Sequence, residues 1–397
     1  MAKMRESLAI CPNSKEELVE LGKKHPLVGP TQYSLLMRSP QPTSLSVGDR
    51  PSTALGIAEQ YGLRTFELGN RRYLGGKSKL LDFIQDEAVK ALGKEPDSVF
   101  DVFAGTGVVG YHFAIQGVPV ISNDLLQHNY FGLQTFMGPQ EIDLKQLAEK
   151  IIDLQKLSPK KNYFSEHFGG NFFSETNAKK IGVIRDEIEL ISSNLREKAA
   201  LVTALIYAAD RVANTVGHYD AFHRGQDIQT PIELKLPNIL QFKTTANEAY
   251  CQDAITLAPQ VKAEVAYLDP PYNSRQYSDA YHLLENLAAW EKPEVRGVAK
   301  KMDRSHLKSD FCGRAAPKTF AELISKLETR MIIVSYNNTS ENLNSRSNAA
   351  ISDEEILKSL KSRGKVSVKE VAFNGFTTGK TKKREHTERL FICKVKD

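Results

Sequence analysis

The chain has 397 residues, 41% of them hydrophobic and 25% charged, and its formal net charge at pH 7 is +5. This is the composition of an ordinary globular protein, and the length allows one large α/β domain with an insertion, or two domains. No apolar run is long enough to cross a bilayer and the N-terminus lacks the apolar core of a signal peptide, so we expect a cytoplasmic protein without a membrane partner. The four cysteines are far apart and form no CxxC pair, so we expect no metal site. The mildly basic charge is compatible with a polyanionic partner.

The first 60 residues have the features of an N-terminal arm. Ser14–Glu17 fits a capping box, which predicts a short helix ending at about Lys24. Residues 25–53 then carry several prolines among serines and glycines, which is typical of a surface segment without regular structure.

Residues 61–135 predict the cofactor-binding part of a catalytic domain. After "RRYLGG", apolar residues recur at helical spacing and predict an amphipathic helix beginning at Lys77 or Ser78. The segment "SVFDVFAGTGVVGYHFAIQG" then predicts a strand, a glycine turn and a helix, and "VPVISND" predicts a strand that ends on an acid. These elements follow one another in the order of a nucleotide-binding βαβ unit.

Residues 136–250 differ, because their patterns are mostly helical. Helices are expected around 141–156 and 179–215, with an aromatic loop between them. In residues 251–397 the α/β alternation returns, and "RMIIVSYNN", "KVSVKEVAF" and "ERLFICKVKD" predict strands. The expected fold is therefore α/β: a mostly parallel sheet with helices on both faces and a mostly helical inserted domain.

The glycine loop "DVFAGTG" is a candidate cofactor site. Gly105 and Gly107 allow a sharp turn and a close approach of the backbone to a ligand. Asp124 follows about twenty residues later at a strand end, where a carboxylate can bind ribose hydroxyls. The loop lacks the third glycine of the dinucleotide fingerprint and is no Walker A motif, so a cofactor without a pyrophosphate fits better. A tight turn that binds no ligand is the alternative.

The stretch "AEVAYLDPPY" indicates chemistry on an amino group. Its strand delivers Asp269 at the carboxyl end, where open α/β sheets bind ligands. Pro270 and Pro271 stiffen the turn and remove two N–H donors, so the local acceptors are the Asp269 carboxylate and the Pro270 carbonyl. They stand beside the flat ring of Tyr272, an arrangement that suits an exocyclic amine on a planar base. Accepting both amine hydrogens frees the nitrogen lone pair for attack on a methyl group. A structural Pro-Pro turn with a solvent-facing aspartate is the alternative.

With these motifs in this order, the sequence resembles the Dam-type, or alpha-group, adenine-specific DNA methyltransferases. The segments "RRYLGGKSKLL", "DVFAGTG", "SND" and "DPPY" are similar to that family's cofactor-contacting segment, cofactor loop, ribose-binding acid and catalytic tetrapeptide. The resemblance implies a Rossmann-like fold that uses S-adenosylmethionine to methylate adenine N6 in double-stranded DNA, after flipping the base out. It also implies that residues 136–250 form the target-recognition region. A cognate restriction endonuclease acting on the same site is the second partner implied.

The same resemblance assigns roles to individual residues. Asp269, Pro270 and Tyr272 take the catalytic positions. Asp253 stands where the family often has an acid for the cofactor's adenine, although "CQD" replaces the usual "GD" and an exposed loop aspartate is the alternative. The implied cofactor-binding residues are Tyr73, Lys77, Asp101, Phe103, Gly105, Gly107, Asp124, Asp253 and Asp269.

Contacts with DNA are expected on loops. Basic residues in "TTGKTKKREHTER" would crowd the tip of a hairpin, and a second basic group lies between Lys300 and Arg314. Polar residues after the catalytic tyrosine could touch the flipped nucleotide, and the glycine-flanked loop "NTVGHYDAFHRG" could help to recognise DNA. Solvated faces, helix capping and packing on the catalytic domain are the alternatives. The predicted DNA-binding residues are Arg224, Asn273, Arg275, Lys380, Lys382, Lys383 and Arg384.

Three other functions remain open from sequence. The same chemistry could act on adenine in RNA or on cytosine N4 in DNA, although by resemblance the aspartate at the head of the motif favours adenine. A non-catalytic DNA-binding protein with a methyltransferase fold is the third. The retention of Lys77, Gly105, Asp269 and Tyr272 argues against it, because a decayed site has no physical reason to keep all four.

Overall fold

The computed structural model describes residues 53–71, 73–225, 229–240, 246–272, 274–337, 350–373 and 386–396. The helix expected at Ser14 lies outside these ranges. Five residues expected to contact DNA also lie outside them: Asn273, which follows the catalytic tyrosine, and the basic residues Lys380, Lys382, Lys383 and Arg384. In the part that is described, no helix combines the length and the apolar character that crossing a membrane requires.

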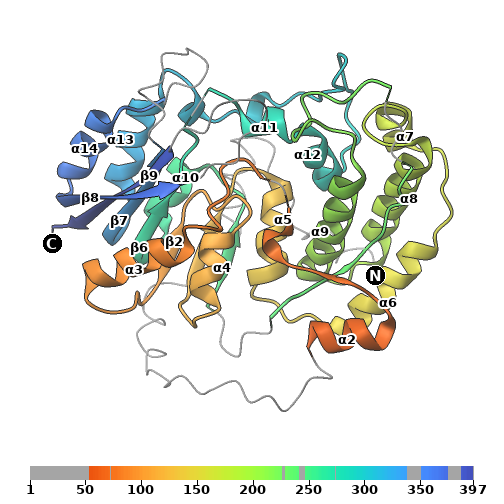
Figure 1. Ribbon diagram of the computed structural model, residues 1–397, viewed down its shortest axis with the longest axis horizontal. Coiled ribbons are helices and arrows are strands. Elements are labelled where there is room, and N and C mark those ends of the chain that lie inside the picture. The colour runs from red at the N-terminus through yellow and green to blue at the C-terminus, as the bar shows by residue number, and fades with distance from the viewer. Residues whose placement is uncertain are drawn as a thin grey trace, which may run out of the picture.

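Within the described ranges, the larger sheet has seven strands and lies in the left half of the view in Figure 1. Its strand order is β5-β3-β2-β6-β7-β9-β8. Neighbours are parallel from β5 through β7, whereas β9 is antiparallel to both β7 and β8. The predicted mostly parallel α/β sheet is therefore confirmed. The strands are β2 (Val99–Asp101), β3 (Val120–Asn123), β5 (Glu248–Tyr250), β6 (Lys262–Leu268), β7 (Glu328–Asn337), β8 (Gly364–Phe373) and β9 (His386–Val395).

Alternate residues of the central strands face two different hydrophobic cores. On β6, Val265 and Tyr267 belong to one core, whereas Ala266 and Leu268 belong to the other. Both faces of this strand are therefore covered, which explains why its sequence is almost continuously apolar. The first face is covered by α3 (Leu81–Leu92), α4 (Val108–Ala114) and α5 (Gln127–Met137), and the second by α10 (Ala254–Leu257), α13 (Ala316–Lys326) and α14 (Asp353–Lys361) (Figure 1).

A helical region lies beside the sheet, next to α5 (Figure 1). Its helices are α6 (Leu144–Lys156), α7 (Tyr163–Phe168), α8 (Glu175–Ile191) and α9 (Leu195–Val212). Side-chain caps begin α6 and α9: Asp143 accepts from the amides of Lys145 and Gln146, and Asn194 accepts from that of Glu197. Helix α9 packs on α5, so the apolar side chains of this region form one continuous core with the first face of the sheet.

The residues before the first motif are attached to this helical region. Helix α2 (Ala54–Tyr61) packs on α6, and the short strand β1 (Thr65–Phe66) pairs in parallel with β4 (Leu236–Pro237). The chain therefore enters the "RRYLGG" segment from the helical side of the molecule.

Two sequence predictions about helices were wrong. The helix expected to begin at Lys77 or Ser78 begins at Leu81, after a turn in which the Leu80 amide donates to the Lys77 carbonyl at 2.8 Å. Lys77 is therefore outside the helix, and its side chain is free to reach the sheet. The aromatic segment expected to be a loop contains α7, because Asn162 forms a capping box at its start.

The helical segment after the DPPY motif is interrupted. It forms α11 (Tyr277–Ala280) and α12 (His282–Ala289), which meet at Tyr281. The Tyr281 hydroxyl accepts a hydrogen bond from the Leu74 amide at 2.8 Å, and its ring stacks on Tyr73 at a centroid distance of 4.9 Å. Tyr281, Leu284 and Ala288 of this segment are buried in the core, and its break joins the "RRYLGG" segment to the helices that follow the motif.

Candidate active site

The carboxyl ends of adjacent parallel strands surround a cavity. β2 ends at Asp101, Asp124 directly follows β3, and Asp269 directly follows β6; β2 pairs with both of the other two strands. This edge is where open α/β sheets bind ligands. The cavity brings together eight of the residues predicted from the sequence: Tyr73, Lys77, Asp101, Phe103, Gly105, Asp124, Asp253 and Asp269.

Asp124 fixes the glycine loop. Its two carboxylate oxygens accept hydrogen bonds from the amide of Gly105 at 2.9 Å and from that of Leu126 at 2.8 Å. Burial raises the pKa of Asp124 to about 6, and these amides oppose the rise. Gly105 has a φ of +55°, and a Cβ there would lie 3.1 Å from the Tyr73 ring. A side chain at position 105 would therefore strain the backbone and crowd Tyr73.

Asp101 and Gly107 hold the glycine loop in place through contacts outside the loop. Asp101 accepts a hydrogen bond from the Gly110 amide at 3.1 Å, which anchors the first turns of α4. Burial raises the pKa of Asp101 to about 8. Gly107 precedes α4 and does not line the cavity; a Cβ there would lie 2.5 Å from Leu133. Both residues therefore position the loop, and Asp101 also reaches the cavity.

Asp269 is part of a buried charged cluster. The Lys77 ammonium lies 3.1 Å from one Asp269 oxygen and 2.9 Å from an oxygen of Glu388. Burial raises the pKa of Asp269 to about 6; Lys77 opposes this rise and Glu388 adds to it. Burial alone would lower the pKa of the Lys77 ammonium, but the two carboxylates raise it above its usual value. Lys77 is therefore charged when Asp269 ionises.

Tyr272 lies beside the cavity and packs at the end of the sheet. Its ring meets Tyr336 edge to face at a centroid distance of 6.4 Å, and its carbonyl accepts from the Ala350 amide at 3.0 Å. Gly75 has a φ of +77°, and a Cβ there would lie 3.7 Å from the Tyr272 ring and 3.2 Å from the Tyr277 hydroxyl. Gly75, the first glycine of "LGGK", therefore approaches both tyrosines closely.

Asp253 and Phe103 also line the cavity. Asp253 is exposed and caps α10, accepting from the Thr256 amide at 3.1 Å. Phe103 meets Phe311 edge to face at 4.9 Å, and both rings line the cavity. Sequence reasoning did not single out Phe311, because it lies in a three-residue 3-10 helix more than two hundred residues from Phe103.

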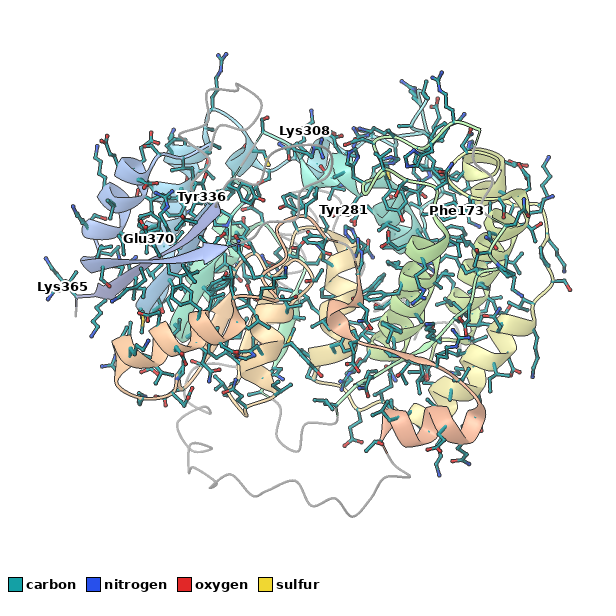
Figure 2. All side chains as sticks on the ribbon, viewed as in Figure 1. Phe173, Tyr281, Lys308, Tyr336, Lys365 and Glu370 are labelled. Carbon is teal, nitrogen blue, oxygen red and sulfur yellow. The ribbon has the colours of Figure 1, made fainter. Side chains whose placement is uncertain are left out.

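The predicted DNA contacts stand apart from this cluster. Arg224 and Arg275 are both exposed, and neither lines the cavity. Of the basic group between Lys300 and Arg314, two members are held by carboxylates: the Lys301 ammonium lies 2.6 Å from Asp220, and Arg304 Nε lies 2.9 Å from Asp279. Lys308 is exposed (Figure 2) and lies in the chain between the cavity-lining residues Leu307 and Ser309.

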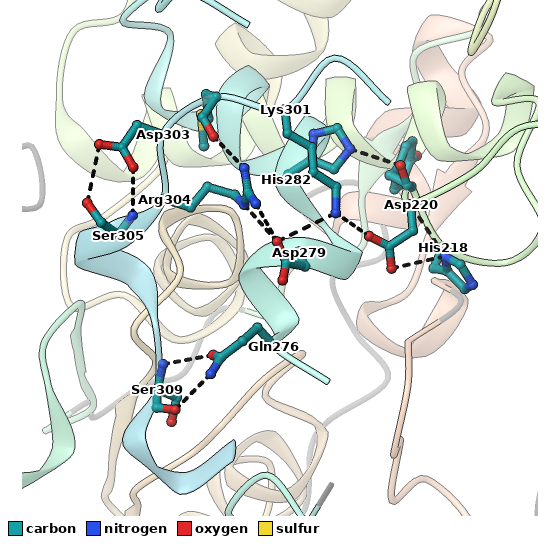
Figure 3. A network of polar contacts seen from close by, with 12 residues as sticks. His218, Asp220, Gln276, Asp279, His282, Lys301, Asp303, Arg304, Ser305 and Ser309 are labelled. Atoms are coloured by element: carbon teal, nitrogen blue, oxygen red, sulfur yellow. Dashed lines mark hydrogen bonds and ion pairs between the residues drawn. The ribbon is translucent and has the colours of Figure 1, made fainter. Parts of the chain in front are cut away.

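A polar network connects the helical region to the segment after the motif (Figure 3). Lys301 contacts Asp220 of the loop after α9 and lies 3.5 Å from Asp279 of α11. On the same loop, the Tyr219 amide donates to the Ala280 carbonyl at 2.8 Å and its carbonyl contacts His282 Nε2 at 2.8 Å. Two interpretations of the loop "NTVGHYDAFHRG" were left open: recognition of DNA, and packing on the catalytic domain. For Tyr219 of this loop, the packing is confirmed.

Asp279→Asn should weaken this network in a pH-dependent way. Burial alone would raise the pKa of Asp279, but bonds from Arg304 and Lys301 lower it below its usual value. A lowered pKa contributes stability above the ordinary carboxyl range, and that contribution is lost as pH falls through the folded-state pKa. We expect a lower melting temperature for the variant at pH 7 and a smaller difference at acid pH. Asp303→Asn is the control, because Asp303 bonds within its own turn, to Ser305 and to the Arg304 backbone. Equal melting temperatures for wild type and Asp279→Asn at pH 7 would contradict the assignment.

Comparison with known proteins gives one family and several relatives. The family described as D12 class N6 adenine-specific DNA methyltransferase matches residues 73–333, which include every residue named above around the cavity except Glu388, Tyr336 and Ala350. Modification methylase StsI of Streptococcus sanguinis is 32% identical over 82% of this chain and 52% of its own length. Type II methyltransferase M.NlaIII of Neisseria lactamica is 30% identical over 79% of this chain and 95% of its own. Type II methyltransferase M.FokI of Planomicrobium okeanokoites is 32% identical over 74% of this chain and 47% of its own length. The match thus spans about half of StsI and M.FokI, and nearly all of M.NlaIII.

Proposed function

The chain belongs to the D12 class N6 adenine-specific DNA methyltransferase family, and on this basis we propose that it methylates the N6 amine of adenine in DNA. We place it in the Dam-type alpha group, because the cofactor loop, the helical region and the DPPY motif follow in that order. The observation that carries the proposal is the meeting of Asp124, Lys77 and Asp269 in one cavity at the carboxyl edge of the sheet.

The cavity residues fit S-adenosylmethionine. Gly105 leaves space that a side chain would fill, Phe103 offers an apolar ring, and Asp124 and Asp253 offer carboxylates for hydroxyl and amino groups. In the proposal, these four residues and Tyr73 hold the cofactor. When bound, the cofactor supplies an electrophilic methyl group on a sulfonium centre.

The chain's own residues then act on the target base. In the proposal, the Asp269 carboxylate and the Pro270 carbonyl accept the two amine hydrogens of adenine, while Tyr272 stacks on the ring. Lys77 holds one Asp269 oxygen at 3.1 Å, which leaves the other oxygen for the amine. Because the cavity is partly closed to water, these bonds act in a low-dielectric setting where they are strong.

DNA must reach this cavity with its base unstacked, because the amine is otherwise buried in the duplex. In the proposal, the exposed cations Arg275, Lys308 and Arg314 contact DNA phosphates, in addition to the predicted basic hairpin. We assign target recognition to residues 136–250, including Arg224. M.NlaIII and M.FokI are named type II methyltransferases, which supports a cognate restriction endonuclease as a second partner.

Transfer of radiolabelled methyl from S-adenosylmethionine tests the proposal. Purified protein is incubated with genomic DNA from a host without methyltransferases, and in parallel with total RNA. We expect label in DNA, and none with the Asp269→Ala variant. Label in RNA alone would favour the RNA alternative. Label in neither nucleic acid would contradict the proposed activity.

The basic hairpin and Arg224 should affect DNA binding differently. Phosphate contacts carry no sequence information, so replacing Lys382 and Lys383 by alanine should weaken binding to cognate and scrambled duplexes alike. Each lost contact should flatten the slope of log affinity against log salt by roughly 0.9. Arg224→Ala should cost roughly 1–3 kcal/mol on the cognate duplex only, if Arg224 contacts a base edge. Salt titrations of each variant on both duplexes measure this; unchanged slopes for the lysine pair would make the hairpin a solvated turn.

A further inference from the structure

Glu388 is a buried carboxylate that the proposed reaction does not yet use. Its side chain is only 3% exposed, and one of its oxygens accepts from Lys77 Nζ at 2.9 Å and from the Ser335 hydroxyl at 2.7 Å. Glu388 lies on β9, between the strands β7 and β8, where its backbone pairs with Asn337 of β7 and with Val371 of β8. Its position is therefore fixed by two strands and by a hydroxyl group.

The buried cluster of Lys77, Asp269 and Glu388 has more negative than positive charge when both acids are ionised. One cation, Lys77, serves two carboxylates, Asp269 and Glu388, and the Lys77 side chain is 7% exposed. A buried carboxylate is costly unless it is paired, so both acids compete for the same ammonium group. Glu388 holds Lys77 from the sheet side, and Asp269 holds it from the cavity side. The charge on Glu388 thus reduces how far Lys77 neutralises Asp269.

We propose that Glu388 is a positioning residue: it holds the Lys77 ammonium against Asp269 and preserves the ability of that carboxylate to accept the adenine amine. This inference rests on the proposed function of Asp269. Glu388 itself is too buried to touch a substrate. It acts through Lys77, whose three N–H donors allow it to bond both acids at once.

Several other titratable groups face Asp269, and they bear on any pH effect. Asp101 lies at the end of the neighbouring strand β2, Tyr267 precedes Asp269 on β6, and Tyr272 and Tyr277 follow it. Burial raises the pKa of all three tyrosines, so they stay neutral over the range in which Asp269 titrates. Glu388 and Lys77 are therefore the charged groups expected to set the titration of Asp269 around neutral pH, with Asp101 adding to it where it ionises.

Glu388→Gln separates this role from a merely structural one. Glutamine keeps the shape and an acceptor for Lys77, but it removes the charge. Lys77 then neutralises Asp269 more fully, so the pKa of Asp269 should fall and the acid limb of the kcat profile should move to lower pH by roughly one unit. The plateau kcat should fall between about 10- and 100-fold, because the carboxylate becomes a weaker acceptor and the ammonium group is less well placed.

Ser335→Ala and Glu370→Gln complete the set. Ser335→Ala loosens Glu388 but keeps every charge, so kcat should fall while the acid limb stays in place. This variant also carries the test if Glu388→Gln does not fold. Glu370→Gln is the matched control, because Glu370 is exposed on the outer strand β8 (Figure 2) and should leave both quantities unchanged.

The titration of the Asp269 carboxyl carbon by NMR, without cofactor or DNA, gives a readout that does not need activity. Asp269→Asn identifies the signal. We expect the Asp269 pKa to be lower in Glu388→Gln than in wild type. An unchanged Asp269 titration, or an active Glu388→Gln variant with the wild-type kcat and acid limb, would overturn the inference. A wild-type protein that transfers no methyl group would instead overturn the proposed function, while the titration would still decide whether the two acids are coupled.

Discussion

Asp269→Ala is expected to lower kcat for methyl transfer by at least about three orders of magnitude, because an acceptor that acts in the transition state would be lost. The same change should leave the dissociation constant of S-adenosylmethionine within about tenfold, since Asp269 is assigned to the base. Its loss also leaves Lys77 paired with Glu388 alone, which keeps the buried ammonium neutralised. Single-turnover transfer and equilibrium cofactor binding, measured on the same preparation, separate these two effects.

A conservative variant sharpens this test. Asp269→Asn keeps the size of the side chain and one carbonyl acceptor but removes the charge, so its loss of kcat should be large but smaller than that of alanine. For the wild type, transfer should decline as pH falls through about 6, where Asp269 takes up a proton, and the Asp269→Asn variant should lack this acid limb. More than a few per cent of wild-type turnover in Asp269→Ala would remove Asp269 from the catalytic role.

Asp124→Ala is expected to weaken cofactor binding by roughly 10- to 100-fold, because a hydrogen bond to a charged group contributes about 1.5–3 kcal/mol. The effect has two sources in the structure. The carboxylate is available to a ribose, and it also holds the glycine loop through the amides of Gly105 and Leu126. Once a saturating cofactor concentration is reached, kcat should recover most of its wild-type value.

Asp124→Asn distinguishes the two sources. Its amide oxygen can still accept from one loop amide, so a loss as large as that of alanine would assign the effect to the charge and the ribose. Asp153→Ala, on the exposed face of α6, is the control and should bind the cofactor as wild type does. A cofactor titration of Asp124→Ala that coincides with wild type would exclude Asp124 from the site.

The sequence could place Asp124 and Asp269 because local patterns determine them. Each follows a short apolar strand, and the carboxyl ends of parallel strands share one edge of the sheet. The glycines of the loop were predictable for the same reason, since a positive φ at Gly105 follows from the sharp strand-to-helix turn. The sheet itself was predictable from the order of apolar segments.

Three features could not be predicted from the sequence, because they depend on contacts between distant segments: the role of Glu388, the start of α3 and the break at Tyr281. Glu388 reaches Lys77 across 311 positions, and only the insertion of β9 between β7 and β8 brings them together. A single acid at the start of an apolar strand, as in "ERLFIC", was the only local signal. The late start of α3 was not predictable for a similar reason, because Lys77 lies before the helix and pairs with Asp269 and Glu388, which are distant in the sequence. The break at Tyr281 likewise depends on a hydrogen bond from Leu74, more than two hundred residues away.

The most direct test of the account is sequencing, with a method that reports N6-methyladenine, of DNA from cells that express this protein in a methyltransferase-free host. The account predicts N6-methyladenine at one short recurring sequence, present with the wild type and absent with Asp269→Ala. N4-methylcytosine at such a sequence, or DNA without any new methylated base while the protein is folded and binds S-adenosylmethionine, would contradict it.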